Sequence, residues 1–181
     1  MARNLEWFED ESFWDHFAPI MFDEARWAEV PAVVDGLELL ASPNQDTQSD
    51  AREPLRVLDL CCGLGRISVE LALRGYSCTG VDITASYLEA AKESARDEEL
   101  TIDFIQQDIR RFIRPQSFDL AVNLYTSFGY FNNPSDDALV CRNAHASVVP
   151  GVPSSSKCWG RKSLLGILPK VKALNAKATQ S

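Results

Sequence analysis

The chain has 181 residues, of which 45% are hydrophobic, and its formal net charge is −8. This length and composition suit one domain with a sizeable core. The acidic balance argues against a nucleic-acid partner, because domains of that class carry clustered basic charge. No run of about 18 apolar residues is present, so we expect no membrane span. The start is acidic and rich in tryptophan where a leader peptide would be basic and apolar, which predicts a cytoplasmic protein.

Residues 4–30 mix aromatic and acidic side chains, and their spacing predicts one or two amphipathic helices that break near Pro19. One interpretation is that the aromatic side chains pack against a sheet edge, and the other is that they form a lid over a ligand pocket. A further helix is expected over residues 31–40 and a polar linker over 41–54, so residues 1–40 would form a cap. The aromatic residues concerned are Trp7, Phe8, Phe13, Trp14, Phe17 and Phe22.

The segment from residue 55 to residue 82 has the strongest pattern in the chain. Residues 56–60 form a short apolar run that contains Asp59, and the small-residue turn CCGLG follows it. Apolar positions then recur at helical spacing up to Gly75, which suits a helix C-cap. A second strand over 77–81 ends at Asp82. The order of strand, glycine turn, helix and strand predicts a βαβ unit.

This unit would form a ligand site at one edge of the sheet. Gly63 and Gly65 lack Cβ atoms, so the turn can adopt positive φ and a ligand can approach the backbone. Backbone N–H groups of the helix from Arg66 onward would face that ligand. Asp82 would lie on the same rim, because the carboxyl ends of parallel strands meet there, and its carboxylate could accept both hydroxyl hydrogens of a ribose. The ligand would be a dinucleotide or S-adenosylmethionine.

Two departures from the dinucleotide pattern separate these ligands. Ser68 stands where G-x-G-x-x-G requires its third glycine. Asp59 would repel a pyrophosphate but would suit an ammonium group, which S-adenosylmethionine carries. The run VLDLCCGLGR…GVD resembles motif I and the following acidic strand end of class I S-adenosylmethionine-dependent methyltransferases. An oxidoreductase that binds NAD and a non-catalytic fragment or binding protein remain the alternatives.

The resemblance implies an α/β fold with a Rossmann-like doubly wound sheet, in strand order 3-2-1-4(-5), over residues 55–151. The spacing after Asp82 predicts a helix over 83–96, with Thr84 or Ser86 as its N-cap, and a strand over 100–106. By the resemblance, Asp108 would meet the adenine amino group and Ile109 would cover the adenine ring. The residues expected to bind the cofactor S-adenosylmethionine are Asp59, Cys61, Gly63, Gly65, Arg66, Asp82, Ile83, Asp108, Ile109 and Asn123.

Residues 117–124 have the alternation of a further strand, and the loop YTSFGYF that follows would border the same crevice. This run resembles the fourth-strand motif of small-molecule methyltransferases, which implies a small-molecule methyl acceptor. Ligand contact and packing are equally open interpretations for Asn123, Tyr125 and Ser127. Tyr125 and His145 are the only acid–base candidates. No catalytic residue is assigned, because positioning and water exclusion can supply most of the catalysis of an in-line methyl transfer.

The five cysteines have no metal-ligand spacing, so no metal site is expected. The adjacent Cys61 and Cys62 are interpreted as small turn residues in preference to a redox pair. A helix over 136–149 then leads to Pro150 and Gly151, where the resemblance ends.

The last part of the chain departs from the domain pattern. Residues 152–181 place three serines and a proline where an apolar fifth strand is required, and the last 31 residues hold six of the 18 basic residues and none of the 26 acids. In a shifted reading frame with favourable synonymous codons, residues 153–166 begin Phe-Phe-Val-Glu-Val, which would be such a strand. We therefore expect a frameshifted tail, a sheet incomplete at its C-terminal edge and impaired methyl transfer. A genuine basic tail is the alternative.

Overall fold

The computed structural model describes residues 6–41, 53–125 and 127–150. Its centre is a four-stranded parallel sheet in the order β3-β2-β1-β4, which confirms the predicted 3-2-1-4 order. The strands are β1 (Arg56–Leu60), β2 (Ser77–Asp82), β3 (Asp103–Gln106) and β4 (Leu120–Val122). The helices are η1 (Trp7–Glu9), α1 (Glu11–Met21), α2 (Glu24–Ala28), α3 (Val30–Ala41), α4 (Arg66–Leu73), α5 (Ala85–Asp97) and α6 (Pro134–Ser147).

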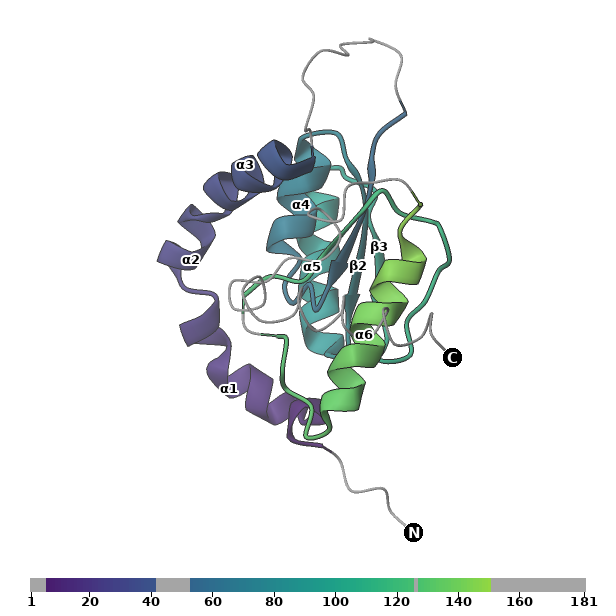
Figure 1. Ribbon diagram of the computed structural model, residues 1–181. Helices are drawn as coiled ribbons and strands as arrows, with labels where there is room; N and C mark the ends of the chain where they lie inside the picture. The colour runs from purple at the N-terminus through teal and green to yellow at the C-terminus, as the bar shows by residue number, and fades with distance from the viewer. Residues whose placement is uncertain (1–5, 42–52, 126, 151–181) are drawn as a thin grey trace.

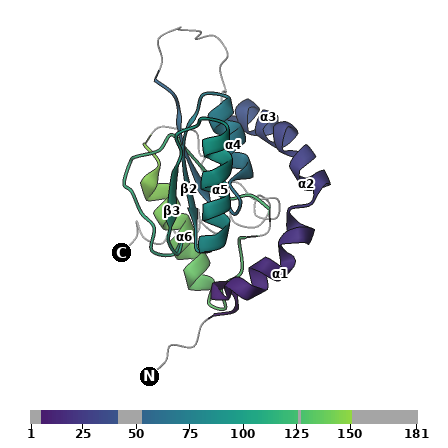
Figure 2. The same ribbon diagram turned by 180° about the vertical axis from the view of Figure 1, so that it is seen from behind.

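The alternation of side chains along β1 separates the two faces of the sheet. Leu58 and Leu60 belong to a core cluster that includes Val140 and Ala144 of α6. Val57 belongs to the other cluster, which includes residues of α3 and α4. Successive strand residues point to opposite faces, so Asp59 points to the α4 side. Figures 1 and 2 show α4 and α5 on one face of the sheet and α6 on the other.

The βαβ unit has the predicted local structure. Gly65 takes the N-cap position of α4 with a φ of 73°, and Gly75 follows the helix with a φ of 88°. Glycine suits both positions, because left-handed backbone costs a residue with a Cβ about 1–2 kcal/mol. Thr84 stands at the N-cap of α5, as predicted, but its side chain makes no capping hydrogen bond. The backbone N–H of Thr84 is bonded instead to Asp82, which places the strand end and the helix start together.

The N-terminal helices form an arc along one side of the domain (Figure 1). The predicted break near Pro19 lies just after the proline, because α1 continues through Pro19 and ends at Met21, and α2 begins at Glu24. Pro19 has no N–H to donate to the Asp15 carbonyl, and this loss is tolerated because Asp15 is exposed to water and the helix ends two residues later. Phe22 ends the helix, and Asp23 caps α2 by accepting a hydrogen bond from the Arg26 N–H.

β4 is shorter than the predicted strand over 117–124 and pairs along its length with β1. Its entry is held on the other side by a parallel bridge between Phe118 and Val148, just after α6. The prediction for residues 152–181 lies outside the described residues, as does most of the predicted linker. Within the described ranges, no helix is both long and apolar enough to cross a membrane.

Candidate functional site

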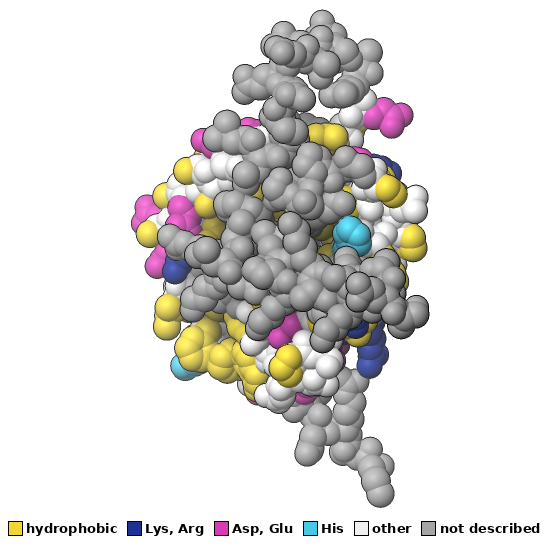
Figure 3. All heavy atoms as spheres, viewed as in Figure 1, with side chains coloured by type: hydrophobic (Ala, Val, Ile, Leu, Met, Phe, Trp, Pro, Cys, Tyr) yellow, Lys and Arg dark blue, Asp and Glu magenta, His cyan; other side chains and the backbone are white. Residues whose placement is uncertain are grey.

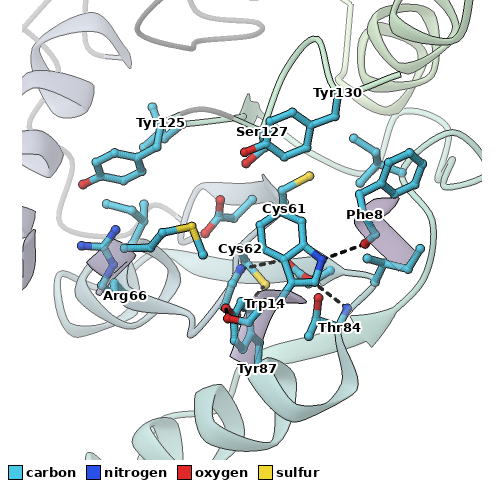
Figure 4. Close-up of a pocket in the computed structure, with 18 of the residues that line it drawn as sticks. Phe8, Trp14, Cys61, Cys62, Arg66, Thr84, Tyr87, Tyr125, Ser127 and Tyr130 are labelled. Carbon is cyan, nitrogen blue, oxygen red and sulfur yellow. Dashed lines mark hydrogen bonds between the residues drawn. The ribbon is translucent and has the colours of Figure 1, made fainter. Parts of the chain in front are cut away.

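A cavity of about 410 Å³ lies at the carboxyl ends of β1 and β2, beneath η1, α1 and α2. Eight of the ten residues expected to bind the cofactor line it, and they come from three separate segments of the chain. These are Asp59, Cys61, Gly63, Arg66, Asp82, Ile83, Asp108 and Ile109. Figure 4 shows Cys61 and Cys62 in the middle of the lining, with Arg66 and Tyr125 together at one end and Phe8 at the other.

The two glycines of the turn have different surroundings. A Cβ added to Gly63 would lie 3.1 Å from the Phe22 ring, so Gly63 faces the cavity and its aromatic roof. A Cβ added to Gly65 would lie 2.8 Å from the Ala91 Cβ and 3.0 Å from the Phe104 ring. Gly65 therefore allows close packing of the turn on α5 and β3, and the expectation of ligand contact fits only Gly63.

Asp82 joins the glycine turn to the start of α5. Its two carboxylate oxygens accept hydrogen bonds of 2.9 Å from the backbone N–H groups of Gly63 and Thr84. The residue is 8% exposed, and burial raises its pKa although these two hydrogen bonds lower it. Each carboxylate oxygen can accept more than one hydrogen, so Asp82 keeps acceptor capacity toward the cavity.

Asp59 is a second buried carboxyl group beside the turn. It is 3% exposed and accepts a hydrogen bond of 2.7 Å from the Ser68 hydroxyl of α4. Its pKa is raised to about 7, mainly by burial and also by the nearby Asp82 charge, against the opposing effect of the Ser68 hydrogen bond. Ser68 thus has a structural reason to replace glycine at this position. A cation in the cavity would favour the ionised form of Asp59.

Arg66, the first residue of α4, is a buried cation at one end of the cavity. Its guanidinium carbon lies 4.8 Å from the Tyr125 ring centroid and 5.2 Å from the Phe22 ring centroid. The guanidinium also donates a hydrogen bond to the backbone carbonyl of Arg26. Burial is the main cause of the lowered pKa of Arg66. The contacts connect the glycine turn to the α2 segment of the cap.

The exit of β3 supplies Asp108 and Ile109 to the cavity. The Asp108 carboxylate is turned toward Arg110, whose Nη2 lies 2.7 Å from its Oδ2. Burial raises the pKa of Asp108, but the hydrogen bonds and charge of Arg110 outweigh burial and hold it below its ordinary value. Asp108 is therefore an ionised acceptor at the end of the cavity next to Phe8.

Side chains of the cap are tied to α5 and to one another above the cavity. The Tyr87 hydroxyl of α5 donates to the Trp14 carbonyl at 2.6 Å, and the Trp14 indole N–H donates to the Phe8 carbonyl at 2.7 Å. The Phe22 ring meets the Tyr87 ring edge-on, with centroids 5.3 Å apart. These residues all line the cavity, so the aromatic cap segment closes over the site. The contact of Tyr87 with the cap could not be predicted from the sequence, since spacing gives no sign of a partner 73 residues away.

The end of β4 differs from the expectation. Asn123 does not line the cavity, although it is buried and its Nδ2 has no hydrogen-bond partner within the described part of the chain. Tyr125 does line the cavity, with a left-handed φ of 66°, and burial raises the pKa of its hydroxyl. Ser127 lines it as well. His145 is exposed on α6 and lies outside the cavity lining, so it does not serve as an acid–base group there.

A parallel sheet with a glycine turn and an acidic strand end around one cavity defines a nucleotide-type ligand-binding domain of the Rossmann class. Residues 57–151 match a family model described as a methyltransferase domain. The chain therefore belongs to the class I S-adenosylmethionine-dependent methyltransferases.

Curated relatives match part of the chain. The ubiquinone biosynthesis O-methyltransferase of Histophilus somni is 26% identical over 137 residues, which cover 68% of this chain and 58% of that protein. A protein of Geobacillus sp. (strain WCH70) that carries a methyltransferase name is 35% identical over 81 residues, which cover 45% of this chain and 33% of that protein. The chain thus spans between a third and three fifths of the length of these relatives.

Solved structures share the fold. The PH0226 protein of Pyrococcus horikoshii OT3 superposes with a TM-score of 0.64 at 22% identity, covering 93% of this chain and 69% of that one. Magnesium protoporphyrin IX methyltransferase of Synechocystis, crystallised with S-adenosylmethionine, gives a TM-score of 0.59 at 19% identity, covering 78% and 69%. At these identities the comparison concerns the fold alone.

Proposed function

We propose that this chain binds S-adenosylmethionine in the cavity and transfers its methyl group to a small-molecule acceptor. The observation that carries the proposal is the position of Asp82, which is buried on the cavity rim and bonded to the N–H groups of Gly63 and Thr84. A carboxylate fixed in this way can accept the hydroxyl hydrogens of a ribose. A dinucleotide is less suited, because the second carboxyl group, Asp59, would face its phosphates.

Other residues would hold the remaining parts of the donor. Asp59 would favour the methionine ammonium group, while Cys61 and Gly63 would bring backbone close to it. Asp108 would accept from the adenine amino group, with Ile83 and Ile109 against the rings. Arg66 would contribute positive charge at the opposite end of the cavity. Asn123 would act only through the backbone around it, because its side chain does not reach the cavity.

The acceptor would enter between the cap and the loop after β4. Phe8, Trp14, Tyr130 and Phe131 form a largely aromatic wall there, and Tyr125 and Ser127 supply hydroxyl groups. A cavity of this size is within the usual range of small-molecule sites, about 300–1,000 Å³. A concave, largely aromatic site favours a small molecule with an apolar part over a polymer.

When bound, S-adenosylmethionine supplies an electrophilic methyl group on a positively charged sulfur. The acceptor atom forms a bond to the methyl carbon as the carbon–sulfur bond breaks, and the electron pair of that bond goes to sulfur. The aromatic cap would exclude water, and the fixed carboxylates would set the direction of attack. A proton carried by the acceptor atom would pass to solvent, because the raised pKa of Tyr125 keeps its hydroxyl protonated. Tyr125 could orient the acceptor by a hydrogen bond but would not take its proton.

Calorimetry with S-adenosylmethionine and S-adenosylhomocysteine tests the donor site. We expect Asp82→Ala to weaken binding by about 1–3 kcal/mol, the usual loss for a hydrogen bond to a charged group. Asp119→Asn is a control, because Asp119 pairs with Arg56 at the opposite end of the sheet. Equal affinity of Asp82→Ala and the unchanged chain would contradict the ribose assignment. Binding of NADH that S-adenosylhomocysteine does not displace would contradict the proposed function.

A further inference from the structure

Arg110 is the centre of a charge cluster at one end of the cavity. Its Nε donates to both carboxylate oxygens of Asp108, at 3.1 and 2.9 Å, and its Nη2 lies 2.7 Å from Oδ2. Its Nη1 lies 3.0 Å from Glu6 Oε1, just before η1, and 3.4 Å from Asp136 Oδ2 in α6. One guanidinium therefore bonds to carboxylates from three segments that are distant in the sequence.

The same guanidinium contacts two aromatic rings of the cavity wall. Its central carbon lies 5.3 Å from the Phe8 centroid and 4.8 Å from the Phe131 centroid. Phe8 and Phe131 also meet edge-on, with centroids 5.3 Å apart. Phe8 belongs to the cap, and Phe131 belongs to the loop after β4 where the acceptor would enter. The planar guanidinium of an arginine can stack on aromatic rings, and the ammonium group of a lysine cannot.

The Arg110 side chain does not line the cavity, whereas Asp108, Phe8 and Phe131 do. Its backbone carbonyl accepts a hydrogen bond of 2.9 Å from Asn143 of α6, which fixes the segment that carries it. Hydrogen bonds to Asp108 are the main cause of the raised pKa of Arg110, so its charge is permanent at any working pH. Without this cation, three carboxylates would be left near one another with no shared counter-charge.

We propose that Arg110 is a positioning residue that links donor binding to closure of the cap, by holding Asp108 in place for the donor and Phe8 and Phe131 in place for the acceptor side. This inference rests on the proposed function and adds a residue that touches neither ligand. Its distinctive consequence is coupling: Glu6 and Asp108 bond to different nitrogens of one guanidinium, so a change at either one should affect the other through Arg110.

The first test compares affinity for S-adenosylhomocysteine by calorimetry in Arg110→Gln, Arg110→Lys and Arg56→Gln. We expect Arg110→Gln to lose about tenfold or more, the equivalent of about one charged hydrogen bond. Arg110→Lys should recover only part of the loss, because lysine keeps the charge but not the fork or the stacking. Arg56→Gln is the matched control, because it breaks an arginine–aspartate pair at the amino end of β1, away from the cavity.

The second test is a double-mutant cycle with Glu6→Gln and Asp108→Asn. In the unchanged background their effects on affinity should be non-additive, and in the Arg110→Gln background they should become additive. Hydrogen exchange over residues 7–21 should be faster in Arg110→Gln than in Arg56→Gln, even without ligand. If Arg110→Gln does not fold, Glu6→Gln alone should still speed this exchange and weaken binding about threefold, since the Asp108 pair remains.

Two outcomes separate the hypotheses. If the unchanged chain binds S-adenosylhomocysteine and the Arg110→Gln or Glu6→Gln variants bind equally well, Arg110 has no positioning function and the proposed function stands. If the unchanged chain does not bind it, the proposed function fails, and the link between Arg110 and the donor fails with it. A cycle that is additive in both backgrounds also overturns the coupling.

Discussion

At the scale of single residues, Asp59 gives the clearest dependence on pH. Its pKa of about 7 in the folded chain exceeds its ordinary value of 3.8, so the folded state holds a proton that the unfolded state has released. The stability contributed by this proton is complete below about pH 4 and is lost as pH rises toward 7, by up to about 1.4 kcal/mol per pH unit. The raised pKa of Asp82 acts in the same direction.

Asp59→Asn should isolate this effect. The asparagine side chain can keep the hydrogen bond to Ser68 without an ionisable group. The free energy of unfolding of the unchanged chain should therefore fall relative to that of the variant between about pH 4 and pH 7. Urea denaturation at each pH measures the difference. Parallel plots of unfolding free energy against pH for the two proteins would mean that Asp59 titrates near its ordinary value. Whatever the pH dependence, the variant should bind S-adenosylmethionine more weakly than the unchanged chain.

The two glycines of the turn make a second residue-scale prediction. Gly65→Ala should destabilise the fold, because its Cβ would lie within 3.0 Å of Ala91 and Phe104 and its φ is left-handed. Gly63→Ala should cost about 1–2 kcal/mol for its φ alone, because the Phe22 ring can turn aside. Thermal unfolding measures the loss of stability in each variant, and calorimetry measures the loss of donor affinity. The ratio of affinity loss to stability loss should be larger in Gly63→Ala than in Gly65→Ala. Equal ratios in the two variants would contradict the assignment of Gly63 to the cavity.

At the scale of elements, the cap is the segment whose order should depend on ligand. It is held by a few hydrogen bonds, such as those between Tyr87 and Trp14 and between the Ala85 N–H and Glu11, and by rings that line the cavity. Hydrogen exchange over α1 and α2 should therefore slow when S-adenosylhomocysteine is added. Peptides from α6 provide the control. Unchanged exchange in α1 and α2 would make the cap a static cover.

Elements with local signals could be predicted from the sequence, and contacts between distant segments could not. The βαβ unit follows from apolar spacing, glycines and the final Asp82, all within 28 consecutive positions. The separate tasks of Gly63 and Gly65 depend on Phe22 and Phe104, which the spacing of the turn does not reveal. The role of Arg110 as a link could likewise not be predicted, because only Asp108 is near it in the sequence, whereas Glu6 and Asp136 are distant.

On the outer surface of the cap, apolar side chains gather over the lower part of α1 (Figure 3). Phe17 and Ile20 are exposed there, at 38% and 67%. The aromatic pattern of residues 4–30 therefore serves two surfaces, because Phe8, Trp14 and Phe22 line the cavity while Phe17 faces outward. A stripe of aromatic residues in a sequence does not reveal this division by itself.

At the scale of the whole molecule, the edge of β4 that faces away from β1 needs a partner strand or a cover. Within the described residues, β4 pairs along its length with β1 only, and an unpaired strand edge invites association between chains. We expect a chain whose reading frame is restored after residue 151 to unfold at a higher temperature and to transfer methyl groups faster than this one. Thermal unfolding and transfer of labelled methyl from S-adenosylmethionine to a panel of small molecules measure both.

A chain ending at residue 150 is the matched control for that comparison. If residues 151–181 contribute nothing, it should match the present chain in both measurements. Equal stability and equal turnover of the present and restored chains would contradict the expected frameshift defect, and the transcript sequence gives an independent answer about its origin.

The location of the tryptophans makes the intrinsic fluorescence of the protein informative about the cap. Trp7, Trp14 and Trp27 all belong to the cap region, and the fourth tryptophan lies outside the described residues. The indole of Trp14 lies against the cavity itself (Figure 4). Emission from this protein therefore reports mainly on the segment that covers the site, so the arrival of an adenine-containing ligand or a loosening of the cap can be followed in real time without any attached dye.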